Sequence, residues 1–349
     1  MRRPLIALGV ALLLLLVAAG AASLVLGIGP LAPASAARSV IFVAISRSAD
    51  EADAREIEAI DLVAGTRELF AAGGRITALA VSPDRRSLYV GLADGKVVML
   101  DATTGATFAS VDLGVGPALA SLVPTGDGRT LFALQVTNST SALVPIDLVT
   151  RKALEPIRFS LSAGSAALVG RSIVVPLWDS RSTQLAYVDV ATRAETSRIG
   201  LSRASFAPPA AFRISDAVAG VVAFESGGPG GLGVHVYAVD DPPHWRDVQL
   251  PAPFPQGTQG RASSIGVQVA VAADGTIHAC TAAGTAGRRY AITPRLQAIQ
   301  AGIECGPLAG GDEIVMAKRD PAQVLVLDAK TGKALRSLPL AGVPARLVR

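Results

Sequence analysis

The sequence predicts an all-β fold, a β-propeller of seven four-stranded blades, preceded by one N-terminal hydrophobic helix. The first observation is a short turn motif that recurs along the chain. The second is that the strands between the turns are apolar on both faces, as expected where neighbouring sheets cover each one. In addition, 35 glycines and 22 prolines among 349 residues suit many short strands joined by turns.

The recurring motif is an apolar residue, an Asp and a turn that often contains Thr-Gly, followed by a short strand. Its copies are marked by Asp61, Asp101, Asp147, Asp189, Asp240, Thr293 and Asp328. Successive markers are 40, 46, 42, 51, 53 and 35 residues apart. A four-stranded blade takes about 40–50 residues, so seven markers predict seven blades. Asp can accept hydrogen bonds from nearby backbone N–H groups and Gly tolerates positive φ, so we assign the motif to the hairpin between the third and fourth strands.

A second series of turns, between the first and second strands, lacks a copy for the first blade. After the N-terminal segment, residues 39–44 have the pattern of a second strand, and residues 342–348 have that of a first strand. We therefore expect residues 38–349 to form one propeller domain that is closed by the C-terminal strand. Such a closure removes the open ends that an arc of sheets would leave.

The second blade carries a family resemblance. Residues 81–90 (VSPDRRSLYV) and 100–105 (LDATTG) resemble the YVTN-type, WD40-like β-propeller repeat, which has a Ser-Pro-Asp-Gly turn, a Tyr-Val strand and Asp-x-x-Thr-Gly. Arg85 stands where that repeat usually has Gly. The resemblance implies a fold much more than an activity.

Residues 1–37 are predicted to be a signal peptide or a signal anchor. Residues 5–26 are nearly continuous Leu, Val, Ala and Ile, and as a helix they would span about 33 Å, close to the bilayer core. That length favours an uncleaved anchor, whereas the small residues at 34–36 favour cleavage near Ala36. Either way, Arg2 and Arg3 stay in the cytoplasm and the propeller is exported, as a membrane-anchored domain or as a secreted or periplasmic one.

Charge argues against nucleic-acid binding. The formal net charge is +4, and the Lys and Arg residues after Arg3 are scattered, with no run longer than two, so the concentrated basic footprint that nucleic acids require is missing. The sequence shows no phosphate loop, no nucleophile motif and no paired metal motif, so we expect no cofactor, no metal site and no catalytic residues.

Ligand binding is expected on the face that holds the loops between second and third strands together with the blade-to-blade linkers. These loops include residues 47–55, 137–141, 178–183, 227–233 and 318–321, with the linker 251–264. Trp178, Asp179 and Arg181 are the candidate ligand-binding residues, because an exposed Trp beside charged groups can anchor a partner. The alternative is that Trp178 packs between blades.

Cys280 and Cys305 are the two cysteines of the chain. They fall in adjacent predicted blades, so in an oxidising compartment they are a disulfide candidate. Two buried free thiols are the alternative.

The leading functional hypothesis is a non-catalytic, extracytoplasmic binding scaffold for a protein, glycan or cell-wall ligand. It would also contact the membrane through residues 5–26 if the leader is uncleaved. The alternative is a propeller enzyme or enzyme subunit, similar to a lactonase or to the large subunit of a quinoprotein amine dehydrogenase. Fold alone does not decide between them.

Overall fold

The computed structural model describes residues 40–48, 50–114, 116–179, 182–200, 213–214, 221–228, 231–238, 246–249, 266–272, 274–283, 286–293, 297–302, 306–310 and 313–349. The chain divides into two units, Met1–Ser39 and Val40–Arg349, and the described residues all belong to the second. The predicted helix at residues 5–26 and the cleavage site near Ala36 lie outside them. No helix in the described part is long and apolar enough to cross a membrane.

Within the described part of the chain, the strands form seven antiparallel sheets, numbered here from the one that holds β1. The first sheet contains β30 (Val343–Val348), β1 (Val40–Ser46), β2 (Glu56–Asp61) and β3 (Arg67–Ala71), with the short 3-10 helix η2 (Glu51–Asp53) between β1 and β2. The second contains β4 (Ile76–Val81), β5 (Ser87–Leu92), β6 (Lys96–Asp101) and β7 (Thr107–Asp112). The third contains β8 (Ala118–Pro124), β9 (Thr130–Val136), β10 (Ser141–Asp147), β11 (Lys152–Ala153) and β12 (Ile157–Phe159).

The remaining sheets follow in chain order. The fourth contains β13 (Ser162–Ala163), β14 (Ala167–Val169), β15 (Ser172–Trp178), β16 (Thr183–Asp189) and β17 (Ala194–Gly200). The fifth contains β18 (Arg213–Ile214), β19 (Val221–Gly228), β20 (Gly231–Ala238) and β21 (Arg246–Gln249). The sixth contains β22 (Gly266–Val271), β23 (Ile277–Ala283), β24 (Ala286–Ile292) and β25 (Ala298–Gly302). The seventh contains β26 (Leu308–Ala309), β27 (Ile314–Lys318), β28 (Gln323–Leu327) and β29 (Ala334–Pro339).

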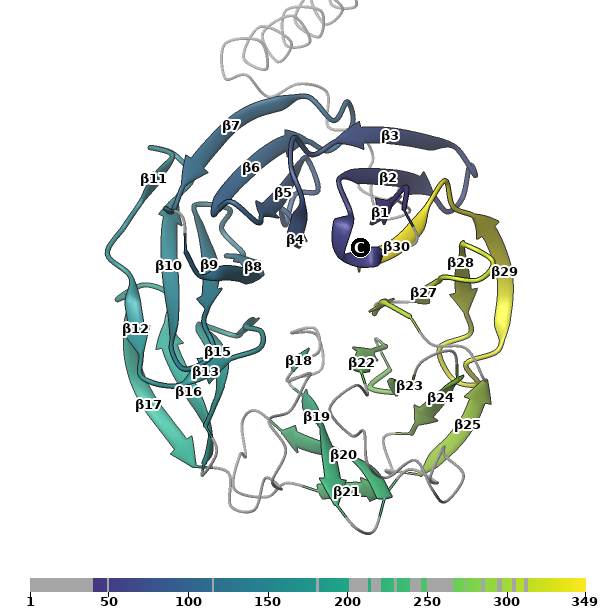
Figure 1. Ribbon diagram of the computed structural model, residues 1–349. Coiled ribbons are helices and arrows are strands. Elements are labelled where there is room, and N and C mark those ends of the chain that lie inside the picture. The colour runs from purple at the N-terminus through teal and green to yellow at the C-terminus, as the bar shows by residue number, and fades with distance from the viewer. Residues whose placement is uncertain are drawn as a thin grey trace, which may run out of the picture. The chain divides into compact units, whose positions relative to one another are not determined.

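Figure 1 shows these sheets following one another around a common centre, with strands such as β4, β8 and β22 innermost and β3, β7 and β25 outermost. Side-chain packing explains this arrangement. Along β1, Phe42 and Ala44 belong to a core cluster shared with the second sheet, whereas Ile41, Val43 and Ile45 belong to one shared with the seventh. Both faces of the strand are buried, which is why its sequence shows no polar alternation.

The aspartate motif forms the hairpin between the third and fourth strands. At Asp61, Asp101, Asp147, Asp189 and Asp328, Oδ1 accepts hydrogen bonds from the backbone N–H groups two and three residues on, at 2.7–3.2 Å. The chain then turns through a residue of positive φ, which is Gly at three copies but Arg151 (57°) and Arg193 (56°) at two. Thr293 follows β24 at the equivalent place, and Asp240 lies outside the described residues.

The two ends of the described chain meet in the first sheet. β30 pairs antiparallel with β1, in a register that places Phe42 opposite Val348 and Ser46 opposite Val343. The innermost strand of this sheet therefore comes from the opposite end of the sequence from its other three strands. No loop joins β30 to β1, so contacts between the strands must hold them together.

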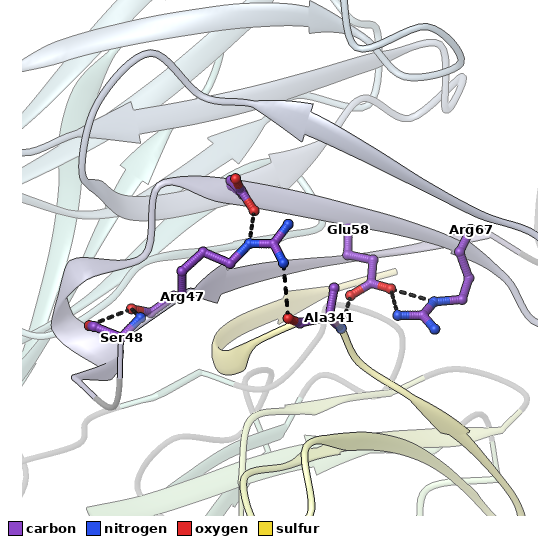
Figure 2. Close-up of polar contacts among 7 residues, drawn as sticks. Arg47, Ser48, Glu58, Arg67 and Ala341 are labelled. Carbon is purple, nitrogen blue, oxygen red and sulfur yellow. Dashed lines mark hydrogen bonds and ion pairs between the residues drawn. The ribbon is translucent and has the colours of Figure 1, made fainter.

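A buried carboxylate reinforces this pairing (Figure 2). Glu58 on β2 is 1% exposed, and its Oε2 accepts a hydrogen bond of 2.8 Å from the backbone N–H of Ala341, which precedes β30. Arg67 on β3 forms an ion pair with the same carboxylate. Arg47 donates from Nη1 to the Ala341 carbonyl at 3.2 Å. We call Arg47, Glu58, Arg67 and Ala341 the Glu58 clasp.

Replacing Glu58 by Gln should lower the free energy of unfolding by about 2 kcal/mol. The change removes the negative charge from a buried, hydrogen-bonded group and leaves Arg67 without its ion-pair partner. Glu56→Gln is the matched control on the same strand, because its ion pair with Arg47 is solvent-exposed and should contribute less than about 1 kcal/mol. Denaturant unfolding of both variants measures the difference, and equal losses would contradict the structural role of Glu58.

Candidate functional site

One face of the ring gathers the hairpins between second and third strands and the linkers from one sheet to the next. The antiparallel order of each sheet dictates this, because successive connections alternate between the two ends of the strands. We call it the linker face. Residues 137–140, between β9 and β10, lie there. So do residues 113–114 and 116–117, between β7 and β8.

A groove of about 530 Å³ lies beside these two segments, between the second and third sheets. Its lining includes Asp112, Leu113, Gly114 and Pro117 from the end of β7 and the linker that follows. The third sheet supplies Gln135, Thr137, Thr140, Ala142, Val144, Leu154, Pro156 and Arg158, among others. The groove thus combines apolar walls with amide, hydroxyl and guanidinium groups.

The floor of the groove is set by strand register in the third sheet. Ala142 on β10 is opposite Gln135 on β9 and also opposite Arg158 on β12. Directly opposite residues of antiparallel strands project to the same face, so these three side chains form one row. Ala142 has the smallest side chain of the row, which leaves space between the amide of Gln135 and the guanidinium of Arg158.

The outer strand of the third sheet is interrupted beside this row, and Pro145 explains the break. Leu154 N donates to the Pro145 carbonyl at 2.8 Å. The N and C=O of one residue in an antiparallel pair point to the same side, so the Pro145 nitrogen also faces the outer strand. Pro has no N–H to donate there. The outer chain therefore fits three residues, 154–156, opposite two on β10, and this bulge separates β11 from β12.

The polar groups of the groove are held by local hydrogen bonds. Gln135 is 8% exposed, and its Nε2 donates weakly, at 3.5 Å, to the carbonyl of Leu113. Asp112 Oδ1 accepts from Gly114 N at 2.8 Å and so shapes the linker. Thr137 Oγ1 accepts from Thr140 N at 2.9 Å and donates to the Thr140 carbonyl at 3.0 Å, which closes the hairpin.

The predicted residues around Trp178 are only partly described. Trp178 ends β15, is half-buried, and lies opposite Ser162 and Thr183 in the fourth sheet. Asp179 Oδ1 accepts hydrogen bonds from the backbone N–H and the hydroxyl of Ser182, at 2.7 and 3.2 Å, so its carboxylate helps to close the hairpin. Arg181 lies outside the described residues, and ligand binding by this group stays a prediction.

Among the described residues, no cluster of three or more His, Cys, Asp or Glu side chains is arranged to hold a metal ion.

A group of buried polar side chains lies between the sixth and seventh sheets. Arg289 is 2% exposed, and its Nη2 donates to the carbonyls of Gly332 and Ala301, at 2.6 and 3.1 Å. Cys280 is directly opposite Arg289 and is disulfide-bonded. Cys305 lies outside the described residues, so its pairing with Cys280 stays a prediction.

His278 belongs to the same buried group and is fully buried. Its Nε2 is 2.6 Å from the carbonyl of Ala329, so the neutral ring carries its proton on Nε2, and its buried Nδ1 has no hydrogen-bond partner among the described residues. Burial lowers the pKa of His278 below its ordinary value of 6.5, and the nearby Arg289 charge lowers it further. The Ala329 hydrogen bond and the charges of Asp274 and Asp328 oppose this shift.

Comparison with known proteins shows the fold. No family profile and no curated protein matches the sequence. Among solved structures, the periplasmic gluconolactonase PpgL of Pseudomonas aeruginosa is similar, with a TM-score of 0.62 and 17% identity over 88% of this chain and 98% of its own. The chain has a β-propeller fold.

Two other propeller structures extend this likeness. The dihydro-heme d1 dehydrogenase NirN has a TM-score of 0.56 and 17% identity over 87% of this chain, which spans 64% of the NirN chain. The WD40 repeats of RRP9 have a TM-score of 0.57 and 12% identity over 78% of this chain and 83% of theirs. At these identities the likeness shows the fold alone, and the YVTN-type repeat in particular stays a resemblance.

The residues of the groove were only partly expected. The sequence indicated the loop of residues 137–141, but it did not point to Gln135, Ala142 or Arg158. These three residues lie side by side because of the register between their strands, and the repeated turn motif does not specify that register residue by residue. Pro145 within a strand and Pro156 shortly after it are the signals that mark the interrupted edge.

His278 should make the protein less stable in mild acid. Its pKa in the folded state is below 6.5, so the unfolded chain binds more protons, and the stability from its neutral form is lost progressively as the pH falls below 6.5. Gln at this position keeps a donor for the Ala329 carbonyl but does not titrate. His278→Gln should therefore weaken the fall in unfolding free energy between about pH 7 and pH 5.

Urea unfolding of wild type and His278→Gln across this range measures the effect. The turn aspartates do not interfere, because their backbone hydrogen bonds lower the pKa of groups such as Asp101 and Asp189, and these titrate at lower pH. Identical pH profiles for the two proteins would contradict the assignment.

Proposed function

We propose that this chain is an extracytoplasmic, seven-bladed β-propeller that binds a ligand on its linker face and does not catalyse a reaction. Seven sheets among the described residues and seven aspartate-type markers in the sequence support the assignment of one four-stranded blade to each sheet. In this proposal a hydrophobic helix at residues 5–26 precedes the propeller.

The groove beside residues 137–140 is the observation that carries the binding function. It lies on the linker face, and its volume of about 530 Å³ is within the range of small-molecule sites, about 300–1,000 Å³. Its polar groups include an amide, two threonine hydroxyls and a guanidinium, which bind ligands by hydrogen bonds and charge. Among the described residues of its lining, Asp112 is the one that carries a carboxylate, and it accepts a hydrogen bond from Gly114 in its own turn.

Export is supported by two features. The apolar stretch at residues 5–26 follows Arg2 and Arg3, which is the charge order of a segment that leaves its N-terminus in the cytoplasm. Cys280 is disulfide-bonded, and structural disulfides persist mainly in oxidising compartments.

The second candidate is a propeller enzyme. It is favoured by the fold shared with PpgL, named as a gluconolactonase, and with NirN, named as a dehydrogenase. A lactonase-like enzyme or a relative of the large subunit of quinoprotein amine dehydrogenases would fit that likeness. Because one propeller fold serves both binding and catalysis, activity must be measured.

The purified full-length chain should not hydrolyse glucono-δ-lactone faster than the lactone opens by itself. A pH-indicator assay measures the rate, with heat-denatured protein as the control, in the presence and absence of Ca²⁺ and Mg²⁺. A rate that increases with protein concentration and saturates with lactone would overturn the non-catalytic proposal and favour the enzyme.

Alkaline phosphatase fused after Arg349 should be active in a bacterial host, because this reporter folds only where disulfides form. The same reporter on a chain that lacks residues 1–37 is the control and should be inactive. Recovery of the fusion in the membrane fraction would support an uncleaved anchor, and recovery in the soluble exported fraction would support cleavage near Ala36. An inactive full-length fusion would contradict export.

A further inference from the structure

We propose that the groove between the second and third sheets binds an acidic sugar, with the sugar carboxylate on Arg158. This inference rests on the proposed binding function and names its ligand class. It follows from the charge at one side of the groove, the hydrogen-bonding groups at the other, and the shape of the interrupted edge strand between β11 and β12.

Arg158 supplies the charge. Its side chain is exposed, and it forms no ion pair or hydrogen bond with any described residue. Register places it on the groove face, beside Ala142. A guanidinium presents several N–H donors in one plane, and a carboxylate accepts two of them at once.

Gln135 supplies an amide that can donate and accept, and Thr140 supplies an oxygen that can accept. The Gln135 side chain is 8% exposed, and its weak bond to Leu113 uses one amide hydrogen at 3.5 Å. The Thr140 hydroxyl, at the mouth, lies 2.9 Å from Thr137 Oγ1 and donates to it, because Thr137 uses its own hydrogen on the Thr140 carbonyl. The Thr140 oxygen can still accept a hydrogen bond from a ligand. Sugar hydroxyls also donate and accept, so amide and hydroxyl side chains match them better than they match a ligand that only accepts.

The remaining walls are apolar. Leu113 and Pro117 line the groove from the linker side, and Leu154 and Pro156 line it from the edge strand. A sugar ring has C–H faces between its hydroxyl edges, and such walls remove those faces from water. Apolar walls with a few convergent polar groups are typical of small-molecule sites.

A peptide carboxylate would offer the same charge, but the edge strand disfavours a peptide. A peptide that bound by strand addition would need free backbone groups on the edge it joins. The bulge at residues 154–156, three residues opposite two on β10, breaks the regular spacing of backbone groups along this edge, and Pro156 has no N–H to donate. The groove therefore favours a ligand that uses side-chain contacts.

Titration calorimetry with two acidic disaccharides tests the inference on the full-length chain. The probes are digalacturonate and N-acetylglucosaminyl-N-acetylmuramic acid, with the dimethyl ester of digalacturonate as the uncharged comparison. At least one acid should bind wild type, and its affinity should fall with added salt. If digalacturonate binds, its ester should bind about tenfold more weakly or worse, because it lacks the charge that strengthens a hydrogen bond to Arg158.

Two substitutions in the groove should weaken binding of the acid. Arg158→Gln removes the charge and should raise the dissociation constant about tenfold or more. Ala142→Leu fills the space between Gln135 and Arg158 and should abolish binding without removing any polar group. Arg336→Gln, at an exposed arginine on β29 of the seventh sheet, is the matched control and should bind as wild type does. Thermal unfolding checks that each variant is folded.

Four results would overturn the inference. The first two are no binding of either acid to wild type and unchanged affinity in Arg158→Gln. The third is equal, measurable affinity for digalacturonate and its ester. The fourth comes from trialanine, titrated in the same way as the peptide comparison, and is tighter binding of trialanine than of the sugars. None of them decides the proposed export or the absence of lactone hydrolysis, which the phosphatase fusion and the lactone assay measure separately.

Discussion

The pairing of β30 with β1 is the interaction on which the rest of the described fold depends. Both faces of β1 are buried, one against the second sheet and one against the seventh. The first sheet obtains its innermost strand from the far end of the chain. The Glu58 clasp fixes the approach to that strand, since Glu58 and Arg47 bind the N–H and the carbonyl of Ala341. Residues 283 positions apart in the sequence are thereby held at hydrogen-bond distance.

Packing on both faces also determines where a ligand can bind. The faces of the sheets are occupied by their neighbours, as the division of β1 between two core clusters shows, so a cavity needs a local interruption. Pro145 provides one in the third sheet, because its missing N–H breaks the outer strand, and Ala142 leaves the adjacent row of side chains incomplete. The groove is therefore a consequence of two residues, Pro145 and Ala142, in a sheet whose faces are otherwise packed against neighbouring sheets.

The repeated turns could be predicted from the sequence because their cause is local. An aspartate that binds the backbone two and three residues on, followed by a residue of positive φ, gives the same hairpin wherever it occurs. Arg151 and Arg193 keep that geometry without Gly, which is why those copies are harder to recognise. The groove could not be predicted in the same way, because Gln135, Ala142 and Arg158 meet through the register of three strands. The charge of Asp179 beside Trp178 favours a binding residue, yet its carboxylate is also used in its own turn.

Amide hydrogen exchange of a variant that ends at Ala341, compared with the full-length chain, tests the closure of the ring most directly. If β30 holds the sheets together, its removal should lower the protection of β9 and β15, in the distant third and fourth sheets, together with that of β1. Loss of protection confined to β1, β2 and β3, with β9 and β15 unchanged, would contradict the account, because the remaining sheets would then be stable without the closing strand.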